Sequence, residues 1–411
     1  MAIGDIFTLP VERIASSGAG VLHFEGGTIF MEQSAPGDVV SGRIILERQS
    51  WSEAELLDII EPSPLRAAPV CPLFSTCGGC SLQHLSYPAQ IDEKTAILKD
   101  AFLRIGGFPL SVEPEVHVSE PFEYRNRIQL HSMAYSMPQP PSPRKRRGPY
   151  RTLPSVARRG QAQRRLGFKA RKSSELIPVS DCPVADMRIR RAFLNGEILP
   201  PAFQDRFTVY GRGELLLVEG SPTARTPARG RMSILGREIL LDASVFFQSN
   251  AAMLEVLLAD LLQTAAWADS CSAAADLYCG VGTFALFLSD RFLSIDLAEE
   301  NRNALSLARE NLKRDHASYY ALRDDQWPRF LQGKHYGFMV MDPPRQGLSP
   351  TLRSWLCREG PPLIAYISCD PASLARDSRE LLAGYRLHSL SWYDFYPQTP
   401  RIESMAVFEK K

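Results

Sequence analysis

From about residue 248 onward, the chain alternates amphipathic segments with short apolar runs. Residues 250–265 have the pattern of an amphipathic helix, and residues 338–341 and 363–367 form apolar runs without a charged side chain. Such runs are typical of parallel strands covered on both faces, whereas strands with one solvated face alternate apolar and polar residues. The alternation predicts an α/β fold built on a doubly wound parallel sheet.

In a doubly wound sheet, ligands bind at the carboxyl ends of the strands. The turn after the strand predicted at 274–278 contains Gly280 and Gly282, which let the backbone approach a ligand closely. Asp296, predicted to end the next strand, can accept hydrogen bonds from ribose hydroxyls. The turn lacks the third glycine of dinucleotide sites and the lysine of phosphate loops, which favours a cofactor without a pyrophosphate, such as S-adenosylmethionine. A tight turn with a purely structural role is the alternative.

Two more segments of the same rim carry reactive groups. Arg345, in Asp342-Pro-Pro-Arg345, stands where amino-group methyltransferases usually have an aromatic residue, and it suits a base carbonyl or a phosphate instead. Cys369 follows the strand at 363–367. A cysteine that adds to C6 of a pyrimidine makes C5 nucleophilic toward a methyl sulfonium. Packing as a small apolar residue is the alternative, but the neighbouring motifs favour a catalytic thiol.

Methylation by this route also needs a base that removes the C5 proton. Glu403, just before the last predicted strand, is the candidate for this proton acceptor. A surface carboxylate at the same position is an equally good interpretation of the sequence alone.

A second group of cysteines is spaced like a set of metal ligands. Four thiolates can bind tetrahedral zinc or an iron-sulfur cluster, and zinc is the commoner outcome for such spacing. Unrelated buried cysteines are the alternative. The candidate ligands are Cys71, Cys77, Cys80 and the distant Cys182. The remaining cysteines outside the rim, Cys271, Cys279 and Cys357, are predicted to be packing residues.

The charge of the chain is unevenly distributed. Residues 144–172 contain twelve Lys or Arg and no Asp or Glu, so the +1 net charge of the whole chain leaves −11 for the rest. The basic stretch suits a polyanion such as RNA, although a solvated charge run is an equal alternative. Glycine and proline punctuation in residues 1–60 predicts a small β-barrel, and five-stranded barrels of the oligonucleotide-binding type commonly hold RNA. Fold alone implies no function.

Length and composition predict a globular protein of three domains. Their expected ranges are 1–62 for the barrel, 63–247 for a central α+β domain, and 248–411 for the doubly wound domain. The central domain contains a helical part at about 86–110 and a basic insertion at about 137–165. The chain shows no secretory signal and no membrane-spanning run, so we expect a cytoplasmic protein without a membrane partner, whose cysteines are not a disulfide framework.

Several motifs together resemble those of the bacterial RNA uracil-C5 methyltransferases, the class I S-adenosylmethionine-dependent family that makes 5-methyluridine in tRNA or rRNA. The resemblance covers nearly the whole chain, and the combination is highly specific. The motifs are Cys71-Pro-Leu-Phe-Ser-Thr-Cys-Gly-Gly-Cys-Ser-Leu-Gln-His84, Phe246-Phe-Gln-Ser-Asn250, Asp276-Leu-Tyr-Cys-Gly-Val-Gly-Thr-Phe284, Met341-Asp-Pro-Pro-Arg-Gln-Gly347, Tyr366-Ile-Ser-Cys-Asp-Pro371 and Ile402-Glu-Ser-Met405.

The resemblance implies a function and roles for individual residues. It implies methylation of C5 of a uridine in RNA, with Cys369 as nucleophile and Glu403 as proton acceptor. It also implies a TRAM-type RNA-binding barrel, a 4Fe-4S cluster rather than zinc on the cysteine set, and packing of the helical stretch after Cys80 onto the catalytic domain. We further expect a monomer. The residues implied to contact S-adenosylmethionine are Gln248, Tyr278, Asp296 and Asp342.

The chain departs from the family pattern at three places. Asp296 stands where members often have Glu, so a ribose contact is expected to be looser or to pass through water. Thr283 replaces an Asn found in some members, and the basic stretch is an insertion whose role the family does not supply. Two other functions stay as alternatives: cytosine-C5 methylation, which shares the cysteine chemistry, and RNA binding without catalysis.

Overall fold

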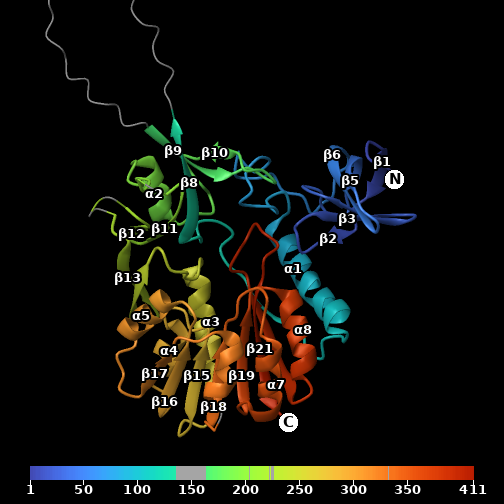
Figure 1. The fold of residues 1–411 in the computed structure, drawn as a ribbon. Coiled ribbons are helices and arrows are strands. Elements are labelled where there is room, and N and C mark those ends of the chain that lie inside the picture. Colours follow the sequence, from blue (N-terminus) through green and yellow to red (C-terminus); the bar gives the residue numbers. More distant parts are fainter. Residues whose placement is uncertain (136–162, 203, 222, 224–225, 332) are drawn as a thin grey trace, which may run out of the picture.

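The computed structural model describes residues 1–135, 163–202, 204–221, 223, 226–331 and 333–411. Most of the basic segment predicted at about 137–165 lies outside this range. The strands β1 to β6 form one group, the strands β8 to β12 a second, and a large sheet flanked by helices a third (Figure 1).

The N-terminal part is rich in strands, as expected. Six strands pair in the order β1-β5-β6-β4-β3-β2 and enclose a core of their own that includes Leu22, Ile29 and Val40. The strands are β1 (Ile6–Pro10), β2 (Arg13–Ile14), β3 (Gly20–Phe24), β4 (Gly27–Met31), β5 (Val39–Glu47) and β6 (Trp51–Glu61). The pairing gives one six-stranded sheet, and a barrel domain over residues 1–62 stays a prediction.

The central part contains a second antiparallel sheet, in the order β10-β9-β8-β11-β12, which packs against α2. A separate hairpin, β13 with β14, leads into the last part of the chain. The elements are β8 (Arg127–Tyr135), β9 (Gln163–Lys169), β10 (Leu176–Pro178), α2 (Met187–Leu194), β11 (Arg206–Arg212), β12 (Leu215–Val218), β13 (Arg229–Ile234) and β14 (Arg237–Asp242).

The large sheet has eight strands in the order β17-β16-β15-β18-β19-β21-β20-β7. The first five are parallel, and β21 enters antiparallel between β19 and β20. This confirms the predicted class I methyltransferase architecture. The strands are β7 (Glu115–His117), β15 (Ala273–Leu277), β16 (Ser294–Ala298), β17 (Ala317–Tyr320), β18 (Tyr336–Met341), β19 (Leu363–Ser368), β20 (Tyr385–Tyr393) and β21 (Glu403–Lys410).

Helices cover both faces of this sheet, which explains its nearly continuous apolar strands. One core contains residues of α3, α4 and α5, and the other contains residues of α1, η1, α6, α7 and α8. The helices are α1 (Tyr87–Ala101), the π-helical turn η1 (Phe102–Gly106), α3 (Ala251–Ala265), α4 (Thr283–Leu288), α5 (Arg302–Asn311), the short η2 (Asp324–Gln326), α6 (Trp327–Leu331), α7 (Pro350–Glu359) and α8 (Pro371–Leu381).

Two segments from before residue 248 belong to the large sheet. The strand β7 pairs with β20, and α1 with η1 packs against α8. No helix in the described ranges is long and apolar enough to cross a bilayer.

Candidate active site

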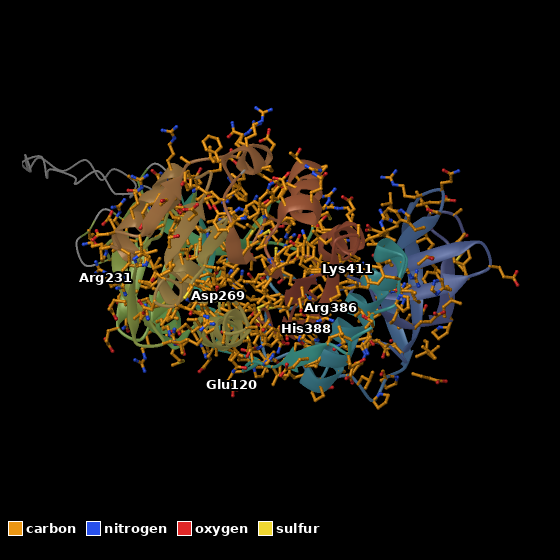
Figure 2. All side chains as sticks on the ribbon, turned by 90° about the horizontal axis from the view of Figure 1, so that it is seen from below. Glu120, Arg231, Asp269, Arg386, His388 and Lys411 are labelled. Atoms are coloured by element: carbon orange, nitrogen blue, oxygen red, sulfur yellow. The ribbon has the colours of Figure 1, made fainter. Side chains whose placement is uncertain are left out.

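The carboxyl ends of the parallel strands form one rim of the large sheet. The opposite edge carries Asp269, Arg386, His388 and Lys411, whose side chains are labelled in the view from below (Figure 2). At the rim, Asp342 directly follows β18 and Cys369 directly follows β19. Because β21 is antiparallel, its first residue, Glu403, also lies at this rim. The fold therefore brings the three candidate groups to the same edge.

Local caps hold Cys369 between two rigid elements. The residue lies between the end of β19 and the first turn of α8, with only Asp370 separating it from that helix. The Asp370 side chain accepts a 2.7 Å hydrogen bond from the Ser373 amide, and Pro371 has the fixed φ that suits the first turn of a helix. The thiol is thus placed by regular structure on both sides.

Cys369 and Glu403 line one cavity of about 360 Å³. The walls are apolar in part, and Phe246 at the cavity keeps 57% of its surface exposed. The lining residues are Phe246, Gln248, Asp342, Pro343, Pro344, Arg345, Cys369, Tyr396, Arg401 and Glu403. We call this the catalytic cavity.

Two carboxyl groups are buried in the catalytic cavity. Burial raises the pKa of Asp342, while a 3.2 Å hydrogen bond from the Gln248 Nε2 opposes this rise. Burial also raises the pKa of Glu403 well above its usual value, and the charge of Asp342 raises it further. The Glu403 Oε1 and the Gln248 Oε1 have no hydrogen-bond partner among the described residues. Buried groups left in this state are suited to a ligand that supplies the missing partners.

Burial raises the pKa of the Cys369 thiol to about 12, and the charges of Glu403 and Asp342 raise it further. Arg345 acts in the opposite direction on Cys369 and on Glu403. The negative charges of the three acidic groups oppose one another, and Arg345 favours the anionic forms of Cys369 and Glu403.

Arginines surround the catalytic cavity without a carboxylate partner. Arg345 and Arg401 line it, and neither forms an ion pair within the described ranges. Burial lowers the pKa of Arg401, and the positive charges of Arg345 and Arg125 lower it further. Guanidinium groups that repel one another at a cavity form a site for a phosphate or a base carbonyl.

A second cavity, of about 690 Å³, shares Pro344 with the first. It lies beside the glycine turn, where Tyr278, Gly280 and Gly282 have positive φ angles of 62°, 54° and 80°. A Cβ on Gly282 would come within 3.0 Å of the Ala308 Cβ, so this glycine lets the turn pack against α5. The lining includes Tyr278, Glu299, Leu322, Asp324, Trp327 and Ser349. We call this the turn cavity.

The predicted position of Asp296 is wrong, because β16 continues to Ala298. The carboxylate of Asp296 accepts a 2.6 Å hydrogen bond from the Tyr336 hydroxyl and also contacts the Lys334 ammonium. Tyr336 begins β18, so Asp296 is engaged at the amino half of the sheet, away from the rim. Glu299 is the acidic residue that follows β16. It lines the turn cavity and accepts a 3.1 Å hydrogen bond from the Gly280 amide.

The four cysteines of the second group line a third cavity, of about 690 Å³, which we call the cysteine cavity. Burial raises the pKa values of the Cys77, Cys80 and Cys182 thiols, to about 12 for Cys182. Each of these thiols also senses the charge of at least one other cysteine of the group and that of Arg125. Within the described residues, no set of three or more His, Cys, Asp or Glu side chains is arranged to hold a metal ion.

The other cysteines lie outside these cavities, as expected. Cys279 is buried in the core, as predicted for a packing residue. Cys357 packs at the edge of the second core, where its thiol donates a 3.4 Å hydrogen bond to the Glu380 carbonyl. Cys271 is exposed, so its predicted packing role is wrong.

Several polar and aromatic residues of the two rim cavities escaped prediction, among them Phe246, Glu299, Tyr396 and Arg401. Phe246 lies two residues before Gln248, and Arg401 two residues before Glu403. Proximity in sequence to a predicted residue was therefore the only available signal for these two. Tyr396 reaches the catalytic cavity through the long connection between β20 and β21, which has no pattern of its own.

Comparison with known families gives two matches. Residues 238–353 match the family model described as "Methyltransferase small domain". Residues 330–411 match the model described as "tRNA (Uracil-5-)-methyltransferase". The two matches together cover the large sheet apart from β7, the glycine turn and the cysteine at the rim.

Relatives match over almost the whole chain. An RNA methyltransferase of Treponema denticola is 29% identical, with 94% of each chain covered. The 23S rRNA (uracil(1939)-C(5))-methyltransferase RlmD of Shewanella denitrificans is also 29% identical, covering 98% of this chain and 95% of its own. Among solved structures, tRNA (uracil-54, C5)-methyltransferase of Pyrococcus abyssi, in complex with S-adenosyl-L-homocysteine, matches with a TM-score of 0.71. It is 23% identical and covers 98% of this chain and 99% of its own.

Proposed function

We infer that this chain, which belongs to the RNA uracil-C5 methyltransferase family, transfers a methyl group from S-adenosylmethionine to C5 of a uridine in RNA. The observation that carries the inference is the catalytic cavity. It combines a thiol, two buried carboxyl groups and two unpaired arginines, and it shares a wall with the turn cavity. Amino-nitrogen methylation has no use for a thiol, whereas C5 methylation requires a nucleophile at C6.

We propose that the turn cavity holds the cofactor, which supplies the methyl group when bound. Tyr278, Gly280 and Gly282 shape the approach, and Glu299 takes the place beside the ribose that the sequence suggested for Asp296. The unpartnered Gln248 Oε1 and the Asp342 carboxyl mark the boundary with the catalytic cavity. An anionic carboxylate at Asp342 is favourable next to a positively charged sulfonium.

In the proposed reaction, the Cys369 thiolate adds to C6 of the uracil, and the ring electrons make C5 the nucleophile. After C5 has gained the methyl group, Glu403 removes its proton. The C6–S bond then breaks and restores both the aromatic ring and the thiolate. The raised pKa of Glu403 makes its ionised form a strong base, and Arg345 supplies a positive charge that favours this ionised form.

RNA reaches the catalytic cavity along a path of aromatic and basic side chains. Arg127 lies 5.4 Å from the ring centroid of Phe246, and Arg401 lies 5.9 Å from that of Tyr396. Exposed aromatic rings stack unpaired bases, and arginines bind phosphates. We propose that Phe246 stacks a base beside the target and that Arg345 and Arg401 bind the neighbouring phosphates or the base carbonyls.

We also propose that Cys71, Cys77, Cys80 and Cys182 hold a 4Fe-4S cluster. All four line the cysteine cavity, whereas the described residues offer no cage for a single ion. Zinc needs its sulfur ligands about 2.3 Å from one centre, while a cuboidal cluster binds each thiolate through a different iron and tolerates wider spacing. The shared cavity supports this proposal, and the positive charge of Arg125 would offset part of the negative charge of the cluster.

The N-terminal sheet supplies, in our proposal, a TRAM-type RNA-binding domain over residues 1–62. The central domain then covers residues 63–247 and the catalytic domain residues 248–411, with β7, α1 and η1 contributed to the catalytic sheet by the central range. We propose that the basic segment at about 137–165 adds affinity for RNA and that the enzyme works as a cytoplasmic monomer.

Methyl transfer from labelled cofactor tests the function. The purified protein should label RNA that lacks its own 5-methyluridine, and nucleoside analysis should find the label in 5-methyluridine. Both tRNA and 23S rRNA are supplied, because the relatives act on one or the other. Label in 5-methylcytidine, or binding of RNA without label, would contradict the inference.

A further inference from the structure

The connection between β20 and β21 forms one wall of the catalytic cavity. It runs through residues 394–402, contributes Tyr396 and Arg401 to the lining, and ends at Glu403. In Figure 1 it belongs to the red part of the chain, above the sheet. Within this connection, which we call the wall loop, Gln398 has a positive φ of 66°. A side chain in this conformation needs surrounding contacts that hold it.

Those contacts come from the segment that follows Cys80. The Gln398 carbonyl accepts hydrogen bonds of 3.0 Å from the Ser81 and Leu82 amides. The Gln90 Nε2 donates to the Gln398 Oε1, and the Gln398 amide donates to the Gln90 Oε1, both at 3.0 Å. Gln90 and Gln398 are only 1% and 3% exposed. Buried hydrogen bonds of this kind are costly to leave unmade.

A second set of contacts joins α1 to the same loop. The Lys94 ammonium lies 2.6 Å from an Asp394 carboxylate oxygen, with both side chains fully buried, and it donates a 3.0 Å hydrogen bond to the Tyr396 carbonyl. The Tyr87 hydroxyl donates to Asp394 at 2.9 Å. A buried ion pair contributes little net stability, but breaking one partner is strongly destabilising. The pair therefore restricts where the wall loop can lie.

We propose that residues 80–94 position the wall loop over Cys369, and that Gln398 is the positioning residue through which the cysteine cavity influences the catalytic cavity. Cys80 directly precedes Ser81, so a displacement of the Cys80 thiol moves an amide that holds the Gln398 carbonyl. The wall loop then shifts Tyr396 and Arg401 relative to the nucleophile. Shifts of about 1 Å at a reacting centre cost on the order of 10²-fold in rate.

The consequence for catalysis rests on the proposed function, but the positioning itself can be measured without substrate. In Gln398→Ala, the backbone bonds to Ser81, to Leu82 and to the Gln90 Oε1 remain, whereas the bonds of the Gln398 side chain to the Gln90 Nε2 and the Pro121 carbonyl are lost. We expect iodoacetamide to alkylate Cys369 several-fold faster than in the unmodified protein, because the wall loop opens. Peptide mass spectrometry gives the rate for Cys369, and Cys357 in the same sample is an internal reference that should not change.

Three further variants complete the experiment. Cys80→Ser should also accelerate alkylation of Cys369, since it disturbs the segment ahead of Ser81. Gln90→Leu removes the side chain that is hydrogen-bonded to Gln398 and should also accelerate alkylation of Cys369. Lys99→Ala changes an exposed residue of the same helix and should leave the rate unchanged. Binding of S-adenosylhomocysteine, expected in the turn cavity, should stay within about twofold in all of them.

The outcomes separate the positioning role from a general loss of structure. Faster alkylation of Cys369 with unchanged binding of S-adenosylhomocysteine supports the proposal, and methyl transfer by Gln398→Ala should then fall in kcat more than it rises in KM. Unchanged alkylation in Gln398→Ala overturns the positioning role. Unchanged alkylation in Cys80→Ser overturns the link to the cysteine cavity. A protein that shows these alkylation rates but methylates no RNA contradicts the proposed function alone.

Discussion

The catalytic cavity and the cysteine cavity are both lined by cysteine thiols whose pKa values are raised by burial. Their neighbours differ. In the cysteine cavity, thiols face other thiols, and Arg125 and Arg171 supply the compensating positive charge. In the catalytic cavity, a single thiol faces two carboxyl groups and two arginines at the rim of the sheet. Several thiolates around one space suit a metal centre, whereas one thiol with a base and cations suits bond formation with a substrate.

The comparison shows that burial and pKa alone do not separate a ligand from a nucleophile. Cys182 and Cys369 have thiols of similarly raised pKa, so the identity of the second group within reach decides the chemistry. A change that removes a cavity's distinguishing group should therefore abolish the chemistry of that cavity.

The largest effect is expected from Cys369→Ala. RNA with 5-fluorouridine at the target should form a covalent adduct with the unmodified enzyme, because fluorine cannot leave as a proton. The variant should form none, and methyl transfer should fall by at least about 10³-fold. Gel analysis of the adduct and the labelled-methyl assay provide the two measurements. Cys357→Ala is the matched control and should behave like the unmodified enzyme. An adduct in Cys369→Ala would show that Cys369 is not the nucleophile.

Glu403→Gln should separate addition from elimination. The methylated RNA should stay covalently bound to Cys369, because no base removes the C5 proton, and turnover should slow by about 10²- to 10⁴-fold. Mass spectrometry of the trapped complex detects the added methyl group. Glu409→Gln, at the exposed end of the same strand, should turn over normally. Rapid release by Glu403→Gln would remove this residue from the mechanism.

Cys182→Ala should abolish cluster binding in the cysteine cavity. Protein prepared without oxygen should show the visible absorbance of an iron-sulfur cluster, and the variant should lose it together with bound iron. Cys271→Ala changes an exposed cysteine and should keep both. One equivalent of zinc without iron in the unmodified protein would contradict the cluster and show that the cysteines bind a single zinc ion. Unchanged iron in Cys182→Ala would exclude this residue as a ligand.

Arg401→Gln should weaken RNA binding by about five- to tenfold and reduce the slope of log Kd against log salt by about 1, because one phosphate contact is lost. Equilibrium binding at several salt concentrations measures both. Arg386→Gln, at the opposite edge of the sheet, is the control. An unchanged salt slope in Arg401→Gln would show that Arg401 does not contact a phosphate and would favour a contact with a base.

The smallest effect concerns stability. The folded-state pKa of Glu403 is raised above its unfolded value, so the stability from burying the neutral acid is present at low pH and is lost as pH rises through the folded pKa. Glu403→Gln avoids that loss. Its unfolding midpoint should match the unmodified protein at pH 5 and exceed it by about 2–4 °C at pH 8. An equal difference at both pH values would contradict the raised pKa.

The sequence predicted the sheet and its rim well because both follow local patterns. Apolar runs located β18 and β19, and the residue after each strand, Asp342 or Cys369, lines the catalytic cavity. The sequence placed Asp296 wrongly because a polar residue inside a strand looks like a strand end. The structure shows that the Asp296 carboxylate accepts a hydrogen bond inside the sheet from Tyr336, which lies forty residues further along the chain.

Long-range contacts account for the rest. Gln90 and Gln398 are separated by 308 residues, and neither belongs to a pattern that suggests its partner. Arg401 was equally hidden, because the positive charges that surround it belong to Arg345 and Arg125, which are far away in the sequence.

The pairing of β7 with β20 limits how the enzyme can be divided. A fragment starting at residue 248 would lack β7 and leave β20 as an unprotected edge, a template for pairing between molecules. It would also lose Leu98 and Phe102 from the core that covers α8. Such a fragment should aggregate rather than fold, so the methyltransferase part is not a transferable module. Shuffling or truncation of this gene can succeed only with breakpoints ahead of α1.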